Sequence, residues 1–103
     1  MLLIREVMYC KPGKVRTMIE KSLAMGKIME RSGQGKMRVM SDFCGERYWT
    51  AVMEFEVPNL AAFENMMSGQ GANEADTKAF EEIMKGYHDL VDHGRREIFK
   101  IEG

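Results

Sequence analysis

In the stretch "RYWTAVMEFEV", Arg47 to Val57, every second residue from Trp49 onward is apolar. Side chains two residues apart share a face of a β-strand, so this segment predicts one fully apolar face and one mixed face. The apolar face carries Trp49, Ala51, Met53, Phe55 and Val57, and the mixed face carries Tyr48, Thr50, Val52, Glu54 and Glu56. Such a strand needs a core beneath one face and a cover other than bulk water over the second.

Length and charge limit the classes of protein that the chain can belong to. With 103 residues, we expect a single domain spanning residues 1–103 with one core. The 15 basic and 16 acidic residues leave no excess positive charge for nucleic acid or an anionic membrane. The first residues lack the basic region of a signal peptide and reach charge at Arg5. We therefore expect a cytoplasmic protein without nucleic-acid or membrane partners.

The order of elements predicts an α+β fold. Helical and strand periodicities alternate along the chain, separated by Gly, Pro and Asn residues, with one break at "SGQGAN", Ser68 to Asn73. The expected strands are residues 1–10, 36–44, 47–57 and 95–101, and the expected helices are 14–31, 59–67 and 73–91, the last capped by Gly94. This order is that of a ferredoxin-like βαββαβ fold with a four-stranded antiparallel sheet.

In that topology both helices pack on one face of the sheet. The second face would expose Tyr48 and Val52 with apolar residues of strands one and two, which is a large apolar patch for a monomer. A second copy of the chain is the simplest cover. We therefore expect a homodimer.

Three segments resemble the dimeric α/β-barrel superfamily, in which two ferredoxin-like chains place their sheets face to face. "IREVMYCKPGKVRTMIE" and "AVMEFEVPNLAAFENMM" are similar to segments of NIPSNAP-like and antibiotic-biosynthesis-monooxygenase-like proteins, and "LVDHGRREIF" is similar to the end of NIPSNAP-like proteins. The resemblance implies two chains forming a barrel. Its known members include cofactor-free oxygenases, haem-degrading enzymes, isomerases and many proteins without an assigned activity.

The haem-degrading members of that superfamily use an Asn on strand one, a Trp on strand three and a His on the following helix. Only Trp49 has a counterpart here, because strand one has no Asn and residues 59–67 contain no His. We therefore expect no haem and no other cofactor.

The mixed strand face predicts a pocket for a small, partly apolar organic molecule inside the barrel. Its expected ligand-binding residues are Arg5, Arg38, Tyr48, Trp49, Thr50 and Val52. Glu6 and Glu54 are candidate catalytic bases, because burial raises the pKa of a carboxyl group, although salt bridges within a dimer interface are the alternative. The sequence leaves open whether Arg5 or Glu6 points inward.

His88 is the third candidate catalytic residue, because imidazole titrates near neutral pH. The segment "HDLVDH" places His88 and Asp92, and Asp89 and His93, four residues apart on an expected helix. Two ligands on a face are too few for a metal, and Cys10 and Cys44 have no zinc-binding spacing, so we expect no metal site and two free thiols.

Two functions remain open from the sequence. The first is a homodimeric barrel that acts on its ligand as a cofactor-independent oxygenase or isomerase. The second is a non-enzymatic module whose role is ligand binding or dimerisation.

Overall fold

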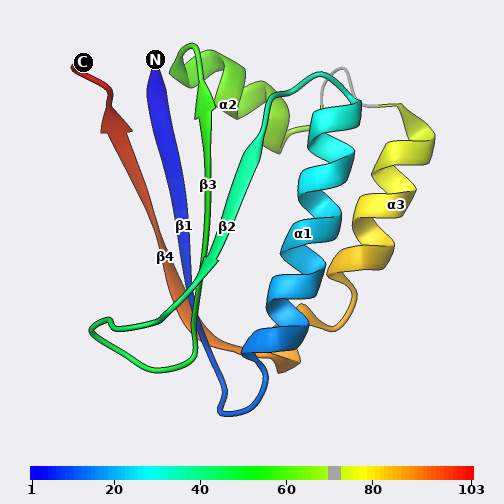
Figure 1. Ribbon diagram of the computed structural model, residues 1–103. Helices are drawn as coiled ribbons and strands as arrows, with labels where there is room; N and C mark the ends of the chain where they lie inside the picture. Colours follow the sequence, from blue (N-terminus) through cyan, green and yellow to red (C-terminus); the bar gives the residue numbers. More distant parts are fainter. Residues whose placement is uncertain (70–72) are drawn as a thin grey trace.

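The computed structural model describes residues 1–69 and 73–103 (Figure 1). The loop predicted at Ser68–Asn73 falls partly on residues 70–72, which lie outside the described residues. The strands are β1 (Leu2–Cys10), β2 (Met37–Ser41), β3 (Thr50–Val57) and β4 (Val91–Lys100), and the helices are α1 (Val15–Arg31), α2 (Leu60–Met67), α3 (Glu74–Met84) and a 3-10 turn, η1 (Tyr87–Asp89).

The four strands form one sheet in the order β2-β3-β1-β4, and every neighbouring pair is antiparallel. Helices α1 and α3 lie on the same side of this sheet (Figure 1). The predicted α+β, ferredoxin-like fold is therefore confirmed, with β1 and β3 at its centre.

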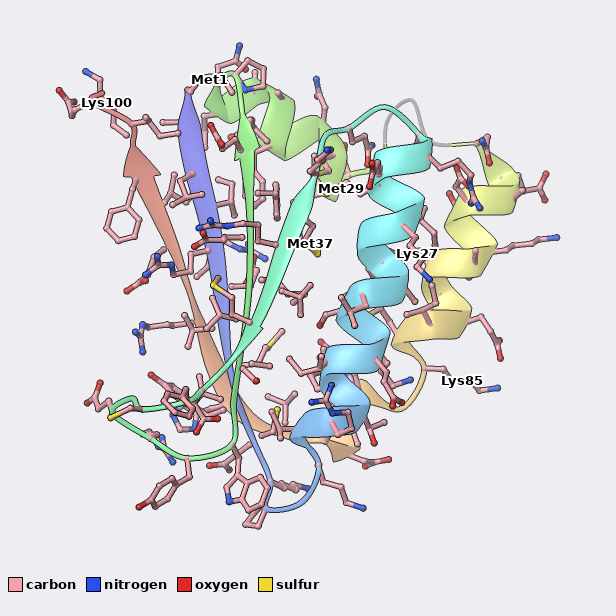
Figure 2. The ribbon with its side chains drawn as sticks, viewed as in Figure 1. Met1, Lys27, Met29, Met37, Lys85 and Lys100 are labelled. Atoms are coloured by element: carbon pink, nitrogen blue, oxygen red, sulfur yellow. The ribbon has the colours of Figure 1, made fainter. Side chains whose placement is uncertain are left out.

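The core fills the space between the sheet and helix α1. Met29 of α1 and Met37 of β2 point into this space (Figure 2). The buried residues of α1 recur at helical spacing, which places them on the side facing the sheet. They are Met18, Ile19, Ser22, Met25 and Met29, and they meet Ala51, Met53, Phe55 and Val57 of β3. Full burial of a Met, Ile, Phe or Val side chain contributes roughly 1.5–3 kcal/mol to folding.

The register of β1 answers the question that the sequence left open. Ile4 is fully buried in the cluster that contains Met29 of α1, so it faces the helices. Because neighbouring residues of a strand point to opposite faces, Arg5 lies on the other face of the sheet and Glu6 shares the helix side with Ile4. We call the face that carries Arg5 the open face.

The last helix is shorter than predicted. Helix α3 ends at Met84, and Gly86 adopts a left-handed backbone with φ 80° before the turn η1. Gly accepts this conformation without the steric cost that other residues meet, so it ends helices efficiently. Strand β4 then begins at Val91, so the predictions of a helix to residue 91 and of Gly94 as its cap were wrong.

Gly94 instead serves the pairing of β4 with β1, where the register shifts at Tyr9 and Cys10. A Cβ atom at Gly94 would lie 2.7 Å from the carbonyl oxygen of Val7. Such a contact is well inside van der Waals distance, so the close approach of the two strands requires glycine here.

Strand β3 begins three residues later than predicted, because Trp49 has a positive φ of 61° and interrupts the extended backbone. Arg47, Tyr48 and Trp49 therefore lie in the loop between β2 and β3. Asparagine side chains cap the N-termini of α2 and α3: the side chain of Asn59 accepts a hydrogen bond from Ala62 N (2.8 Å), and that of Asn73 accepts one from Asp76 N (2.7 Å).

Within residues 1–69 and 73–103, no helix combines the length and apolar character needed to cross a lipid bilayer.

Candidate functional site

The open face of the sheet gathers charged and aromatic side chains from all four strands. Its members follow from the strand register and the alternation of side chains. They are Leu3, Arg5, Val7 and Tyr9 of β1, Arg38 and Met40 of β2, Thr50, Val52, Glu54 and Glu56 of β3, and His93, Arg95, Glu97 and Phe99 of β4.

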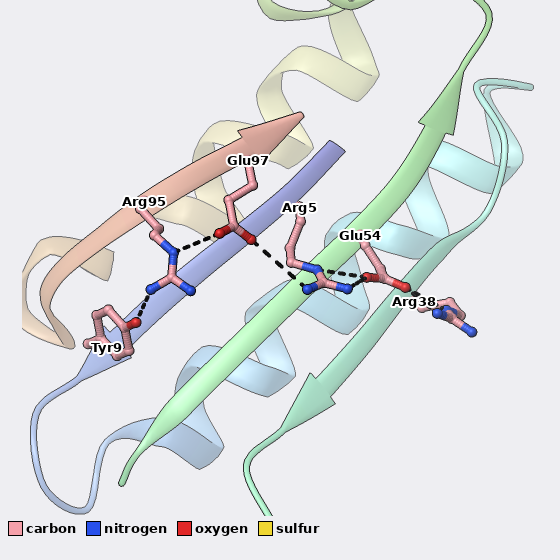
Figure 3. A network of polar contacts seen from close by, with 6 residues as sticks. All are labelled: Arg5, Tyr9, Arg38, Glu54, Arg95 and Glu97. Carbon is pink, nitrogen blue, oxygen red and sulfur yellow. Dashed lines mark hydrogen bonds and ion pairs between the residues drawn. The ribbon is translucent and has the colours of Figure 1, made fainter. Parts of the chain in front are cut away.

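Glu54 occupies the centre of this face and is held by two arginines (Figure 3). Arg5 donates from Nε to Glu54 Oε2 at 3.1 Å, and Arg38 donates from Nε to Oε1 at 3.1 Å and also from Nη2. Only 2 % of the Glu54 side chain is exposed, because the two long guanidinium side chains cover it.

The contacts continue from Arg5 to β4 and back to β1 (Figure 3). Arg5 Nη1 lies 4.0 Å from Glu97 Oε1, and Arg95 donates from Nε to Glu97 Oε2 at 3.1 Å. Arg95 also donates a hydrogen bond to the hydroxyl oxygen of Tyr9. We call these connected side chains the arginine network: Arg38, Glu54, Arg5, Glu97, Arg95 and Tyr9.

The network sets the protonation state of its charged groups. The hydrogen bond from Arg38 lowers the pKa of Glu54 below the ordinary value, burial opposes this effect, and the hydrogen bond from Arg5 adds to it. The contacts with Glu54 raise the pKa of Arg38, and those with Glu97 and Tyr9 raise the pKa of Arg95. Glu54 is therefore an ionised carboxylate at neutral pH, because the two arginines outweigh the effect of burial, and the salt-bridged alternative describes it instead of a raised pKa.

Tyr9 connects the network to a second group of side chains at the end of the sheet. Its ring centroid lies 4.6 Å from the guanidinium carbon of Arg47 and 4.9 Å from the ring of His93. Arg47 Nη1 is 2.8 Å from His93 Nε2, and His93 Nδ1 is 3.2 Å from Asp92 Oδ2. Because arginine can only donate, Nε2 of His93 is the acceptor in its contact with Arg47.

A hollow of about 790 Å³ opens beside Tyr9. The turn after β1 and the loop between β2 and β3 form its walls, and Asp92 of β4 completes them. The lining combines aromatic rings with charged groups, as small-molecule sites commonly do. The lining residues are Tyr9, Cys10, Lys11, Pro12, residues 42–49 and Asp92.

The structure brings most of the predicted site residues together. Arg5, Arg38 and Glu54 contact one another on the open face, and the strand register places Thr50 and Val52 on the same face. Tyr48 and Trp49 are loop residues that line the hollow instead of strand residues.

Glu6 and His88 lie apart from the network. Glu6 is on the helix side of β1, where Arg96 donates a hydrogen bond to its carboxylate. His88 is an exposed residue of the turn η1, and its ring lies 4.0 Å from the ring of Tyr87. The helical pairs expected for His88 and His93 do not form, because helix α3 ends before them.

Sequence reasoning missed the contribution of β4. His93, Arg95 and Glu97 alternate along this strand, and that pattern was available in the sequence. It was hidden by the expectation that the preceding helix continues to residue 91. Arg47 was also missed, because its contact with His93 depends on a loop conformation that no periodicity encodes.

The residues at this site do not fit a haem group. Haem iron requires an axial ligand such as a neutral imidazole nitrogen. Nε2 of His93 is occupied by Arg47, its Nδ1 faces Asp92, and His88 lies in the turn η1 away from the network. In the part of the chain that the structure describes, no three His, Cys, Asp or Glu side chains gather to hold a metal ion. Cys10 is buried, Cys44 is exposed, and both are free thiols.

Comparisons with known proteins bear on the fold. A NIPSNAP domain protein from Burkholderia xenovorans superposes with a TM-score of 0.75 at 12% identity over 99% of this chain and 95% of its own. A NIPSNAP family protein from Agrobacterium tumefaciens superposes with a TM-score of 0.76 at 8% identity over 96% and 90% of the two chains. A protein named antibiotic biosynthesis monooxygenase superposes with a TM-score of 0.60 at 15% identity over the full length of both chains.

No family model matches the sequence, and no curated protein matches it. The structural neighbours confirm the predicted resemblance to NIPSNAP-like and antibiotic-biosynthesis-monooxygenase-like proteins at the level of the fold. At these identities the similarity establishes the class of fold, a ferredoxin-like α+β fold, and does not assign an activity to this chain.

Proposed function

We propose that the protein is a homodimer whose two open faces pack together and enclose a binding site for a small, partly apolar organic molecule. One observation carries the proposal. A connected set of six polar side chains crosses all four strands on the sheet face that lies opposite the helices. In this proposal residues 1–103 act as one domain, and two free thiols are compatible with a reducing cytoplasm.

The composition of the open face supports this kind of ligand. Arg38 remains 75 % exposed although it holds Glu54, so its guanidinium can donate further hydrogen bonds. Arg95 binds the oxygen of Tyr9 and leaves the phenol proton available to a ligand oxygen. Val7, Val52 and Met40 supply apolar contacts between these groups. The site therefore suits a molecule with an apolar body and an anionic or carbonyl oxygen.

Catalysis as a cofactor-independent oxygenase or isomerase is the second candidate function. The imidazole of His93 lies next to Tyr9 and favours it, because once a ligand displaces Arg47 from Nε2 that nitrogen accepts a proton from an acidic hydroxyl or an activated carbon. The name of one structural neighbour, antibiotic biosynthesis monooxygenase, agrees with this chemistry. Glu54 is a poor base because its pKa is lowered, so in this candidate it orients the two arginines.

A matched pair of variants tests the site. The change Arg95→Gln removes the contacts with Glu97 and Tyr9 on the open face, while Arg96→Gln removes an arginine from the helix side of the same strand. Thermal shift with a panel of aromatic carboxylates, quinols and enolisable ketones should find stabilising ligands for the wild type and the Arg96→Gln variant. The Arg95→Gln variant should lose at least tenfold in affinity for them.

Equal affinity of both variants would refute the proposed site. Turnover of quinols or enolisable ketones without an added cofactor, lost in His93→Gln, would establish the catalytic candidate. Binding without turnover would leave the protein as a ligand-binding module.

A further inference from the structure

The loop between β2 and β3, residues 42–49, projects from the sheet on the side opposite helices α1 and α3 (Figure 1). This is the side of the open face. Asp42, Tyr48 and Trp49 at the ends of the loop also border a hollow beside α1, and the rest of the loop extends past the surface that carries the arginine network.

Two large aromatic side chains of this loop are turned to solvent. Phe43 is fully exposed and Tyr48 is 85 % exposed. An aromatic side chain buries about 150–250 Å² when covered, so the pair offers roughly 400 Å² of largely apolar surface. Exposed apolar area of this size is often functional in a monomer.

The base of the loop is fixed, so these aromatic side chains are presented on a defined scaffold. Asp42 N donates to Thr50 O at 3.0 Å, and Thr50 N donates to Asp42 Oδ1 at 2.9 Å. Cys10 N donates to Trp49 O at 2.8 Å, and Arg47 contacts His93. These bonds tie the loop to β1, β3 and β4.

We propose that residues 43–48, the aromatic arm, pack against the open face of the second copy in the dimer. The partner's Phe43 and the partner's Tyr48 would then form part of the wall of each ligand site. This inference rests on the homodimer of the proposed function and goes beyond it, because it assigns a trans contribution to the site.

The area of the interface favours a second copy of the chain, with its aromatic arm, as the partner of the open face. Four strands of about eight residues, at ~3.3 Å per residue and ~4.8 Å between strands, present a projected area of roughly 500 Å². A stable interface buries about 800 Å² on each partner. The roughly 400 Å² of the two aromatic side chains is enough to close this gap of roughly 300 Å².

Charge complementarity supports the same arrangement. Arg47 of the arm is engaged with His93, so the exposed carboxylate of Glu46 is the charge that the arm offers to the guanidinium groups of Arg38 and Arg95, which stay partly exposed beside their own carboxylate partners. A second copy therefore offers opposite charge at the rim of the contact, which directs association and fixes its register.

The test compares an arm variant with a matched control. Phe43→Ser with Tyr48→Ser removes both exposed side chains of the arm. Phe80→Ser removes an exposed aromatic side chain of similar size from α3, on the helix side. Sedimentation equilibrium gives the dimer dissociation constant of each protein, and circular dichroism confirms folding. We expect the constant to rise at least 30-fold for the arm variant and to change less than threefold for the control.

The chain's single tryptophan, Trp49, adjoins the arm and provides a second readout. Its emission should shift to longer wavelength on dilution of the wild type through the dissociation constant. A folded arm variant with the wild-type dissociation constant and an unchanged dilution profile would overturn the trans contact while leaving the homodimer intact. A wild type that is monomeric would overturn both the arm contact and the proposed function.

Discussion

Replacing Glu54 with glutamine removes the central charge of the arginine network without changing side-chain size. Glu54 accepts hydrogen bonds from Arg5 and Arg38 and is almost fully buried. In the variant the amide NH₂ group faces one guanidinium, so one donor meets another donor. Breaking a buried ion pair costs about 3–5 kcal/mol, and solvation of the partly exposed arginines reduces the loss to about 2 kcal/mol.

The thermal midpoint should fall by about 10 °C at pH 7, since ~1 kcal/mol shifts it by 4–8 °C in a domain of this size. Glu56→Gln is the matched control, because Glu56 is exposed on the same strand and face and forms no ion pair within the described part of the chain. Its midpoint should change by less than about 2 °C. Both variants are compared at one protein concentration, since the proposed dimerisation would also shift the midpoint.

The effect should depend on pH in one direction. The folded-state pKa of Glu54 is lowered, so its contribution to stability is fully present above the ordinary carboxyl pKa of about 4.3 and is lost as pH falls through the folded-state pKa. The difference between wild type and Glu54→Gln should therefore shrink as pH falls below about 4. A loss no larger than that of Glu56→Gln at pH 7, or a difference undiminished in acid, would refute the role assigned to Glu54.

Three further predictions concern the dimer, the sheet and haem. Val52→Asp should dissociate or unfold the protein, because an unpaired carboxylate within the proposed interface costs several kcal/mol, and wild-type dimer stability in a sedimentation assay would mean that the open face is not the interface. Gly94→Ala should lower the free energy of unfolding by about 1–3 kcal/mol because its Cβ would meet Val7 O, whereas Gly103→Ala should be neutral in the same denaturant titration. Haemin titration should give no stoichiometric Soret band, and a band that disappears in His88→Ala would contradict the reading of the histidines.

The sequence predicted the fold because its periodicities agree with one another. The alternation of Ala51, Met53, Phe55 and Val57 and the helical spacing of Met18, Ser22, Met25 and Met29 in α1 all describe one buried layer. Such patterns are set by burial, and burial is what strand and helix periodicity encode.

The site was only partly predictable, because its residues are positioned by left-handed backbone conformations at two residues. Gly86 ends α3 early and releases residues 91–94 to β4, which brings His93 and Arg95 onto the open face. Trp49 adopts a left-handed backbone that turns Arg47 toward Tyr9 and His93 in the loop. Neither conformation follows from hydrophobic periodicity. The charge pairing that lowers the pKa of Glu54 was also not predictable, because it depends on the register of three strands.

The oligomeric state in solution tests the central claim most directly. Size-exclusion chromatography with light scattering at micromolar concentration should give twice the chain mass of 11.8 kDa for the wild type. The Val52→Asp variant, if it remains folded, should give the mass of one chain. A wild type that elutes with a mass of 11.8 kDa would contradict the account, since the open face would then be a solvent-exposed surface and not the wall of an enclosed site.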